Sequence, residues 1–166
     1  MKKVVKITVV GLVALMFAFS FAACDFLFDN NGNNGNTPVL PPLSVARQAL
    51  ERAGFEIEEY SEEILIQNTG NLAGWAESVG IVWGGEMVRG FNATCEDRSE
   101  VVGIAEFDTV ASAQQYIEVI RESVRQWEGY TAPENMRRIG AIIYVGDAAA
   151  VEIVRGAIGG NLVSFN

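Results

Sequence analysis

The sequence predicts an α+β fold for residues 43–166, with an antiparallel or mixed sheet of about four or five strands and helices packed on one face. Three observations predict it. Segments with alternating apolar residues are interspersed with segments of helical period. Glycine, serine or aspartate stands at several of their borders, where helices begin and end. The stretch is long enough to bury one hydrophobic core as a single domain.

The first half of this domain contains one clear helix and one clear strand. Ser44 stands where a helix can begin and Gly54 where it can end. "FEIEEY", residues 55–60, alternates as a strand does, with Phe55 and Ile57 on one face. "EILIQN", residues 63–68, is read as a second strand that pairs with it, and a short helix is expected at 72–78.

The second half is clearer. "SEVVGIAEF", residues 99–107, predicts a strand, and "IGAIIYV", residues 139–145, predicts a buried one. Asp147 is placed to cap a last helix through Val154. Residues 109–127 predict a long amphipathic helix. Its apolar stripe consists of Val110, Ala113, Ile117, Ile120, Val124 and Trp127.

Two segments of the second half echo one another. "GIAEFDTVASAQQYI", from Gly103, and "GAIIYVGDAAAVEIV", from Gly140, align without gaps and share a glycine, an aromatic position and two alanines. Each predicts strand, tight turn and helix. An ancient duplication and two independent solutions to one packing problem both fit. The predicted arrangement is ferredoxin-like in outline.

The N-terminal segment has the layout of an export signal. Lys2, Lys3 and Lys6 precede an uncharged apolar run from Ile7 to Ala23. The run is also nearly long enough to span a bilayer as an uncleaved anchor. Both readings place the rest of the chain outside the cytoplasm, because the lysines precede the run and no basic residue follows it before Arg47.

The end of the run is "FAAC", residues 21–24. It resembles the lipobox of bacterial lipoprotein precursors, with Phe21 where leucine is usual. The resemblance implies a signal peptide at 1–23 and a diacylglyceryl thioether on Cys24, with palmitate among the acyl chains. Such chains would hold the protein on the cell membrane, in the cell envelope and facing the extracytoplasmic side, without a transmembrane helix. A plain secreted form and an uncleaved anchor are the alternatives.

Residues 24–42 predict a flexible tether between lipid and domain. The stretch "DFLFDNNGNNGNTPVLPP" is rich in asparagine, glycine and proline and has no helical or strand period. Its asparagines and acids do not fit a calcium-binding loop, since Asn34 stands at the glycine position and Leu40 at the glutamate position. A flexible tether of this length would lift the domain away from the lipid headgroups.

Charge and cysteine content limit the partners. Removing residues 1–23 leaves nine arginines against all 21 carboxylates, a formal charge of −12. This charge disfavours nucleic acid and basic docking on anionic lipid. Cys95 is read as a small residue at a strand end rather than a reactive thiol. If Cys24 carries no lipid, a Cys24–Cys95 disulfide becomes the alternative.

The sequence contains no histidine, which excludes Ser-His-Asp and Cys-His catalysis and histidine-ligated zinc. Phosphate-loop and dinucleotide motifs are missing too. No catalytic residue, metal or cofactor is predicted. The densest acidic patch is expected to be a solvated face, with weak calcium binding as the alternative reading. It consists of Glu56, Glu58, Glu59, Glu62 and Glu63.

Aromatic residues supply the only ligand-site candidates. Trp75, Trp83 and Arg89 border the least readable stretch and could form a platform for a small ligand or sugar. The competing reading is ordinary core packing of the two tryptophans.

Taken together, these features predict a lipid-anchored envelope protein with a small non-catalytic domain that binds an envelope protein or a small ligand. A hydrolase that uses carboxylates on a cell-wall or sugar substrate is the alternative. Pairing of two domains into a homodimer is the third hypothesis.

Overall fold

The computed structural model describes residues 42–165. The predicted signal peptide, Cys24 and all of the tether except Pro42 lie outside this part of the chain, and the predictions for them stay predictions.

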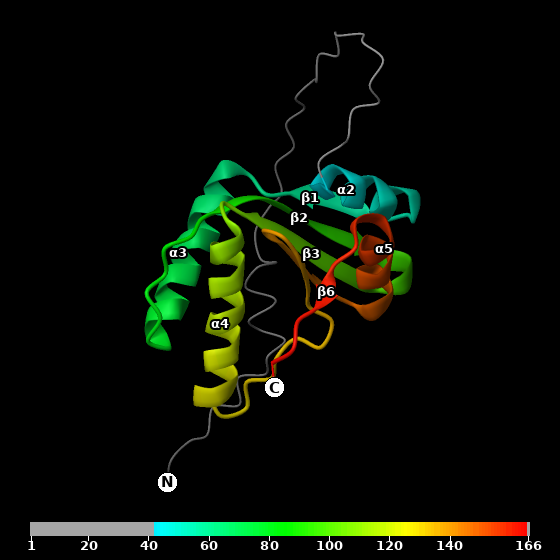
Figure 1. Ribbon diagram of the computed structural model, residues 1–166. Coiled ribbons are helices and arrows are strands. Elements are labelled where there is room, and N and C mark those ends of the chain that lie inside the picture. Colours follow the sequence, from blue (N-terminus) through cyan, green and yellow to red (C-terminus); the bar gives the residue numbers. More distant parts are fainter. Residues whose placement is uncertain (1–41, 166) are drawn as a thin grey trace. The chain divides into compact units, whose positions relative to one another are not determined.

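The described residues form one antiparallel sheet with helices, which confirms the α+β class (Figure 1). The sheet has six strands, in the order β1-β2-β3-β5-β4-β6, rather than four or five. The helices are α2 (Pro42–Arg52), α3 (Glu62–Ser78), α4 (Val110–Gln126) and α5 (Ala148–Ile158). The strands are β1 (Glu56–Glu59), β2 (Met87–Cys95), β3 (Glu100–Phe107), β4 (Arg137–Ile139), β5 (Ile142–Gly146) and β6 (Asn161–Leu162).

Helices cover both faces of the sheet, not the single face that the sequence predicted (Figure 1). The reason is visible in β5, where consecutive residues are apolar. Ile142 and Tyr144 belong to one core cluster, and Ile143 and Val145 pack in the other. Because successive side chains of a strand point to opposite faces, an unbroken apolar run needs cover on both sides.

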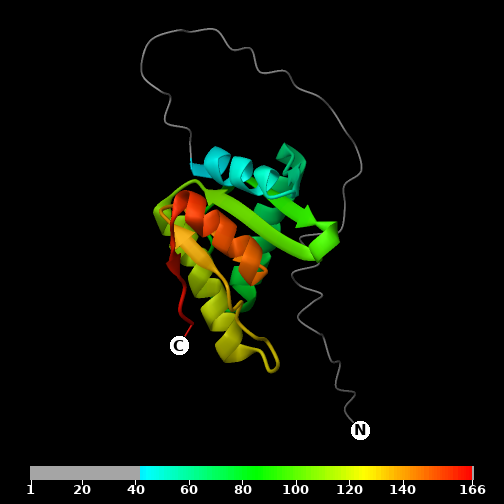
Figure 2. The same cartoon turned by 90° about the vertical axis from the view of Figure 1, so that its right-hand side faces the viewer.

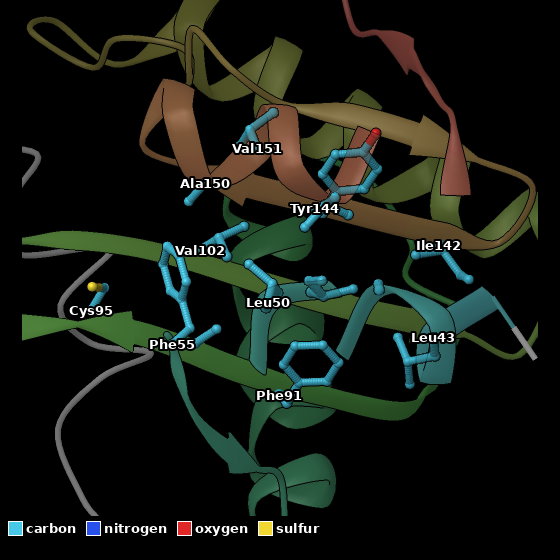
Figure 3. Close-up of a cluster of buried hydrophobic side chains, with 14 residues drawn as sticks. Leu43, Leu50, Phe55, Phe91, Cys95, Val102, Ile142, Tyr144, Ala150 and Val151 are labelled. Carbon is cyan, nitrogen blue, oxygen red and sulfur yellow. The ribbon is translucent and has the colours of Figure 1, made fainter. Parts of the chain in front are cut away.

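Helices α2 and α5 lie side by side on one face (Figure 2). Leu50 from α2 and Val151 from α5 meet Phe91, Val102 and Tyr144 from the sheet, and all five are buried (Figure 3). Cys95 ends β2 and is buried at the margin of the same cluster, which agrees with its reading as a small strand-end residue. Phe55 and Ile57 also pack here, as predicted for one face of a strand.

Helices α3 and α4 cover the other face. Leu72 from α3 and Ile117 and Ile120 from α4 pack on Phe107 and Ile143 of the sheet. The predicted amphipathic helix is therefore confirmed as α4, and Thr109 caps it by accepting a hydrogen bond from the Ser112 backbone N–H at 3.0 Å. Val110, placed on the apolar stripe by the sequence, instead remains 54% exposed in the first turn.

The strand predicted at residues 63–68 is wrong, because these residues begin α3. Ser61 occupies the N-cap, and its hydroxyl accepts a hydrogen bond from the Ile64 N–H at 3.3 Å. Glu62 and Glu63 follow in the first turn, where carboxylates favour the positive end of a helix. The expected short helix at 72–78 is the last part of α3.

Two smaller corrections concern the C-terminal half. The strand predicted at 139–145 is split by a tight turn, in which Gly140 has φ +57°, so β5 begins only at Ile142. Asp147 does occupy the N-cap position of α5, but its Oδ2 accepts from the Val101 N–H at 2.7 Å. The helix continues past Val154 to Ile158.

Candidate functional site

The most distinctive surface feature is the segment that joins α3 to β2, residues 79–86, "VGIVWGGE". We call this segment the strap. Gln115 of α4 brackets it: its Oε1 accepts from the Gly84 N–H at 3.1 Å, and its Nε2 donates to the Val82 carbonyl at 2.5 Å. Glu86 and Asp108 then exchange two hydrogen bonds, of 3.2 and 2.9 Å. The strap is thus held against α4 along its length.

Trp83 lies on the inner side of the strap. Its ring packs edge-on against Phe107, with 6.1 Å between ring centroids. Gly85 lies so close to α4 that a Cβ there would come within 2.4 Å of the Ser112 Cβ. Trp83 is therefore a half-buried packing residue, and the glycine lets the strap approach the helix.

Trp75 is also engaged inside the domain. Its Nε1 donates to the Ser123 hydroxyl at 2.8 Å, and its ring packs against Tyr116, Trp127 and Tyr130. Burial raises the pKa of Tyr130 to about 12. Both tryptophans thus serve the core on the α3–α4 face, as the packing reading predicted.

Arg89 does not join them. It forms an ion pair with Glu106 across β2 and β3, at 2.8 Å, and Glu106 lies directly opposite Ile142 on β5. Directly opposed residues of antiparallel strands share a face, and Ile142 belongs to the cluster beneath α2 and α5. The three ligand-site candidates are therefore divided between two faces of the sheet and do not converge on one platform.

Exposed aliphatic side chains occur on the strap and on the elements that it joins or contacts. Val82 is 89% exposed at its middle, and Ile66 on α3 is 67% exposed. Val110 begins α4, and Val88 follows the strap in β2; both are exposed as well. Sequence reasoning missed this surface, although "GIVWGG" carried a signal, since apolar residues between glycines fit neither a helix nor an alternating strand.

The acidic patch predicted from the sequence is a solvent-facing edge. Glu56 and Glu58 are exposed on β1, which is the first strand of the sheet. Glu59 forms an ion pair with Arg47 of α2. Carboxylates at an edge strand discourage edge-to-edge pairing, which accounts for Glu56 and Glu58 without a ligand.

Hydrogen bonds and arginines lower the pKa of several carboxyl groups. A hydrogen bond from Ser112 and one from the Glu86 backbone lower the pKa of Asp108. Arg121 lowers the pKa of Glu118, and Arg155 lowers that of Glu152. These three carboxylates are held in the charged form, which suits the ion pairs of Glu118 and Glu152 and the hydrogen bonds of Asp108.

Within residues 42–165, no group of three or more Asp, Glu, Cys or His side chains is arranged to hold a metal ion. No helix in this part of the chain is long and apolar enough to cross a membrane. The chain has no significant match to a protein-family model, a curated protein or a solved structure.

Proposed function

We propose that the protein is an envelope lipoprotein, anchored through Cys24 and facing the extracytoplasmic side, whose α+β domain is a non-catalytic binding module. The observation that carries the proposal is "FAAC" at the end of the uncharged run that follows Lys2, Lys3 and Lys6. The thiol of Cys24 is the strong nucleophile that a lipid transfer requires.

The state of the carboxylates supports a binding module over a hydrolase. A general acid that works near neutral pH needs a raised pKa, produced by burial or by a second carboxylate. The carboxylates with a resolved shift, Asp108, Glu118 and Glu152, all have lowered pKa values. Glu56 and Glu58, which the hydrolase hypothesis would use as its two catalytic carboxylates, are exposed on β1.

The anchor is tested by the intact mass of the full-length gene product recovered from membranes. Residues 24–166 plus a diacylglyceryl group are expected, and Cys24→Ser should remove both the lipid and the membrane retention. Cys95→Ser is the matched control, because it removes the other thiol and should keep the lipid. An unmodified full chain, or a soluble chain with a Cys24–Cys95 disulfide, would overturn the anchor.

The absence of catalysis is tested separately with the purified protein and cell-wall glycan. No release of reducing ends is expected. Turnover that is abolished by Glu56→Gln or Glu58→Gln would replace the binding module by a hydrolase.

A further inference from the structure

One side of the domain combines exposed aliphatic side chains with an absence of basic residues. It consists of α3, the strap and residues 110–120 of α4, and we call it the strap side; α3 and α4 lie together on one face of the sheet (Figure 1). Three of the five exposed large aliphatic residues of the described chain lie here: Ile66, Val82 and Val110. Gln115 bonds the carbonyl of Val82 and the N–H of Gly84, so the Val82 side chain is presented by a hydrogen-bonded backbone.

Charge is segregated in the same way. Neither residues 53–88 nor residues 99–120 contain a lysine or arginine. With Asp108 at its border, the strap side carries Glu62, Glu63, Glu77, Glu86 and Glu118. Among the described residues only the last of these forms an ion pair, with Arg121. Elsewhere in the domain most arginines are paired with carboxylates. The strap side therefore offers negative charge that its own domain leaves uncompensated.

The outer face of α3 is also unusually smooth. Ile66, Gly70, Gly74 and Ser78 are exposed and follow one another at intervals of four residues, so they form one row along the helix. A Cβ added at Gly70 or Gly74 would meet nothing within 4 Å. Neither glycine is needed to relieve crowding inside the described domain. The row leaves room for another backbone to approach α3 closely.

We propose that the outer face of α3 and the adjoining strap dock an amphipathic helix of a partner envelope protein, with aliphatic residues on its contact face and Lys or Arg along its borders. This inference rests on the proposed function, since it names the partner class of the binding module. The aliphatic residues cover Ile66, Val82 and the glycine row, as in helix-in-groove recognition. The basic residues neutralise Glu62, Glu63, Glu77 and Glu86.

Charge selects this occupant over two others. A second copy of the chain would place the same carboxylates opposite one another, which repels. An anionic lipid surface would be repelled by the same charge. A basic helix is attracted to it, and its affinity should fall as salt is added.

The test uses the mature protein in phosphatidylcholine nanodiscs, with empty nanodiscs as the blank. The probes are two synthetic amphipathic helical peptides with the same leucine and alanine contact face, one bordered by lysine and the other by glutamate. Fluorescence anisotropy should show binding of the lysine peptide, weakened by salt, and no binding of the glutamate peptide. Equal binding of both peptides, or of neither, would overturn the proposal.

Glycine substitutions localise the contact. Gly74→Gln places a longer side chain on the row and should weaken binding of the lysine peptide about tenfold or more, equal to roughly 1.4 kcal/mol or more. Gly156→Gln is the matched control, since Gly156 is an exposed glycine of α5 that also has nothing within 4 Å of an added Cβ. Equal losses in the two variants would overturn the assignment to α3.

A photo-crosslinking residue at position 66 or 82 of the full-length protein in cells then reports the natural occupant. The expected product joins either position to a helix with basic borders, identified by mass spectrometry of the linked peptide. Linkage to a second copy of this chain, to lipid or to an acidic segment would overturn the proposal. Peptide binding and crosslinking do not depend on the intact-mass measurement that tests lipidation of Cys24. Failure of the anchor and failure of the docking site are therefore distinguishable.

Discussion

The hydroxyl of Tyr60 donates a hydrogen bond to the Asn92 Oδ1 at 2.6 Å, and this contact holds the Tyr60 ring against the sheet beside Gly90. Tyr60 follows the last residue of β1, and its N–H donates to the Gly90 carbonyl at 2.9 Å. The ring lies where a side chain at residue 90 would be, and the hydroxyl lies 3.8 Å from the position of a Cβ at residue 103; both residues are glycine. A polar pair is thus buried in the α3–α4 face, with each member satisfying the other.

Gly90→Ala should destabilise the domain strongly. A Cβ at this position would lie 2.6 Å from the Tyr60 ring and 2.7 Å from the Ile104 carbonyl oxygen. The second contact is with backbone, which cannot move aside, so we expect a loss of about 1–3 kcal/mol in the free energy of unfolding. Urea unfolding followed by circular dichroism measures it.

Gly103→Ala is the control for that measurement. Its Cβ would meet the Asn92 Oδ1 at 3.3 Å and the Tyr60 hydroxyl at 3.8 Å, both side-chain atoms that can shift slightly. The loss should be smaller than for Gly90→Ala. A larger loss at residue 103 would contradict the position assigned to the Tyr60 ring.

Tyrosine ionisation gives a prediction for the whole core. The chain has four tyrosines, Tyr60, Tyr116, Tyr130 and Tyr144, and burial raises the pKa of each above its ordinary value. Unfolded tyrosine ionises near pH 10, roughly. The folded state therefore retains protons that the unfolded state loses, and stability falls as the pH rises above about 10.

Absorbance at 295 nm should accordingly show less tyrosinate in the folded protein at about pH 10 than free tyrosine gives, which is half ionised there. In concentrated urea the midpoint of tyrosine ionisation should return to about pH 10. A fraction of tyrosine that titrates normally without urea would show that at least one ring is solvated.

Asp108 predicts a difference at acid pH. Hydrogen bonds from Ser112 and from the Glu86 N–H lower its folded pKa, so its contribution is present above the unfolded value of about 3.9 and is lost as the pH falls through the folded value. Asp108→Asn should lower the urea midpoint at neutral pH. The difference from the parent protein should shrink below about pH 4.

Asp97→Asn is the control for this pH series, because Asp97 lies in the exposed turn after β2. It should leave the urea midpoint at neutral pH unchanged. A constant deficit for Asp108→Asn down to the lowest pH would mean that the charge of Asp108 does not fasten the strap.

The fold was predictable from the sequence wherever one segment determined its own structure. The stripe of α4 and the alternation of β1 and β3 are local patterns, and all three elements were predicted. The strand predicted at residues 63–68 was wrong because "EILIQN" is a short apolar run without a decisive period. The N-cap at Ser61 instead favours a helix there. Local pattern also gave no means to assign α2 and α5 to one face and α3 and α4 to the other.

The same limit applies to the candidate site. The three ligand-site candidates, Trp75, Trp83 and Arg89, are near one another in sequence. Side chains alternate between the two faces along β2, however, and Arg89 lies on the face opposite to the tryptophans. The strap side could not be seen because its members are distant in sequence: Gln115, which holds the strap, is 33 residues from Val82. Two signals for it were readable in the sequence: the shortage of lysine and arginine around it and the apolar residues between glycines in "GIVWGG".

Gly70→Ala and Gly74→Ala should each stabilise the domain. Both lie inside α3, and an added Cβ would touch nothing. Glycine in a helix interior costs about 0.5–1 kcal/mol relative to alanine, so each variant should raise the free energy of unfolding by about that amount. Thermal and urea unfolding measure the gain, and Gly156→Ala in α5 should give a similar gain as the control.

The combination of this gain with the peptide titration separates two explanations for the glycines. If they are neutral accidents, alanine raises stability and glutamine at residue 74 leaves peptide binding unchanged. If they keep the row smooth for a partner helix, stability rises on α3 and on α5 alike, but only the α3 substitutions weaken binding. A substitution on α3 that raises the free energy of unfolding and weakens binding of the partner would mean that the glycine is kept for binding, because folding stability alone would favour alanine there.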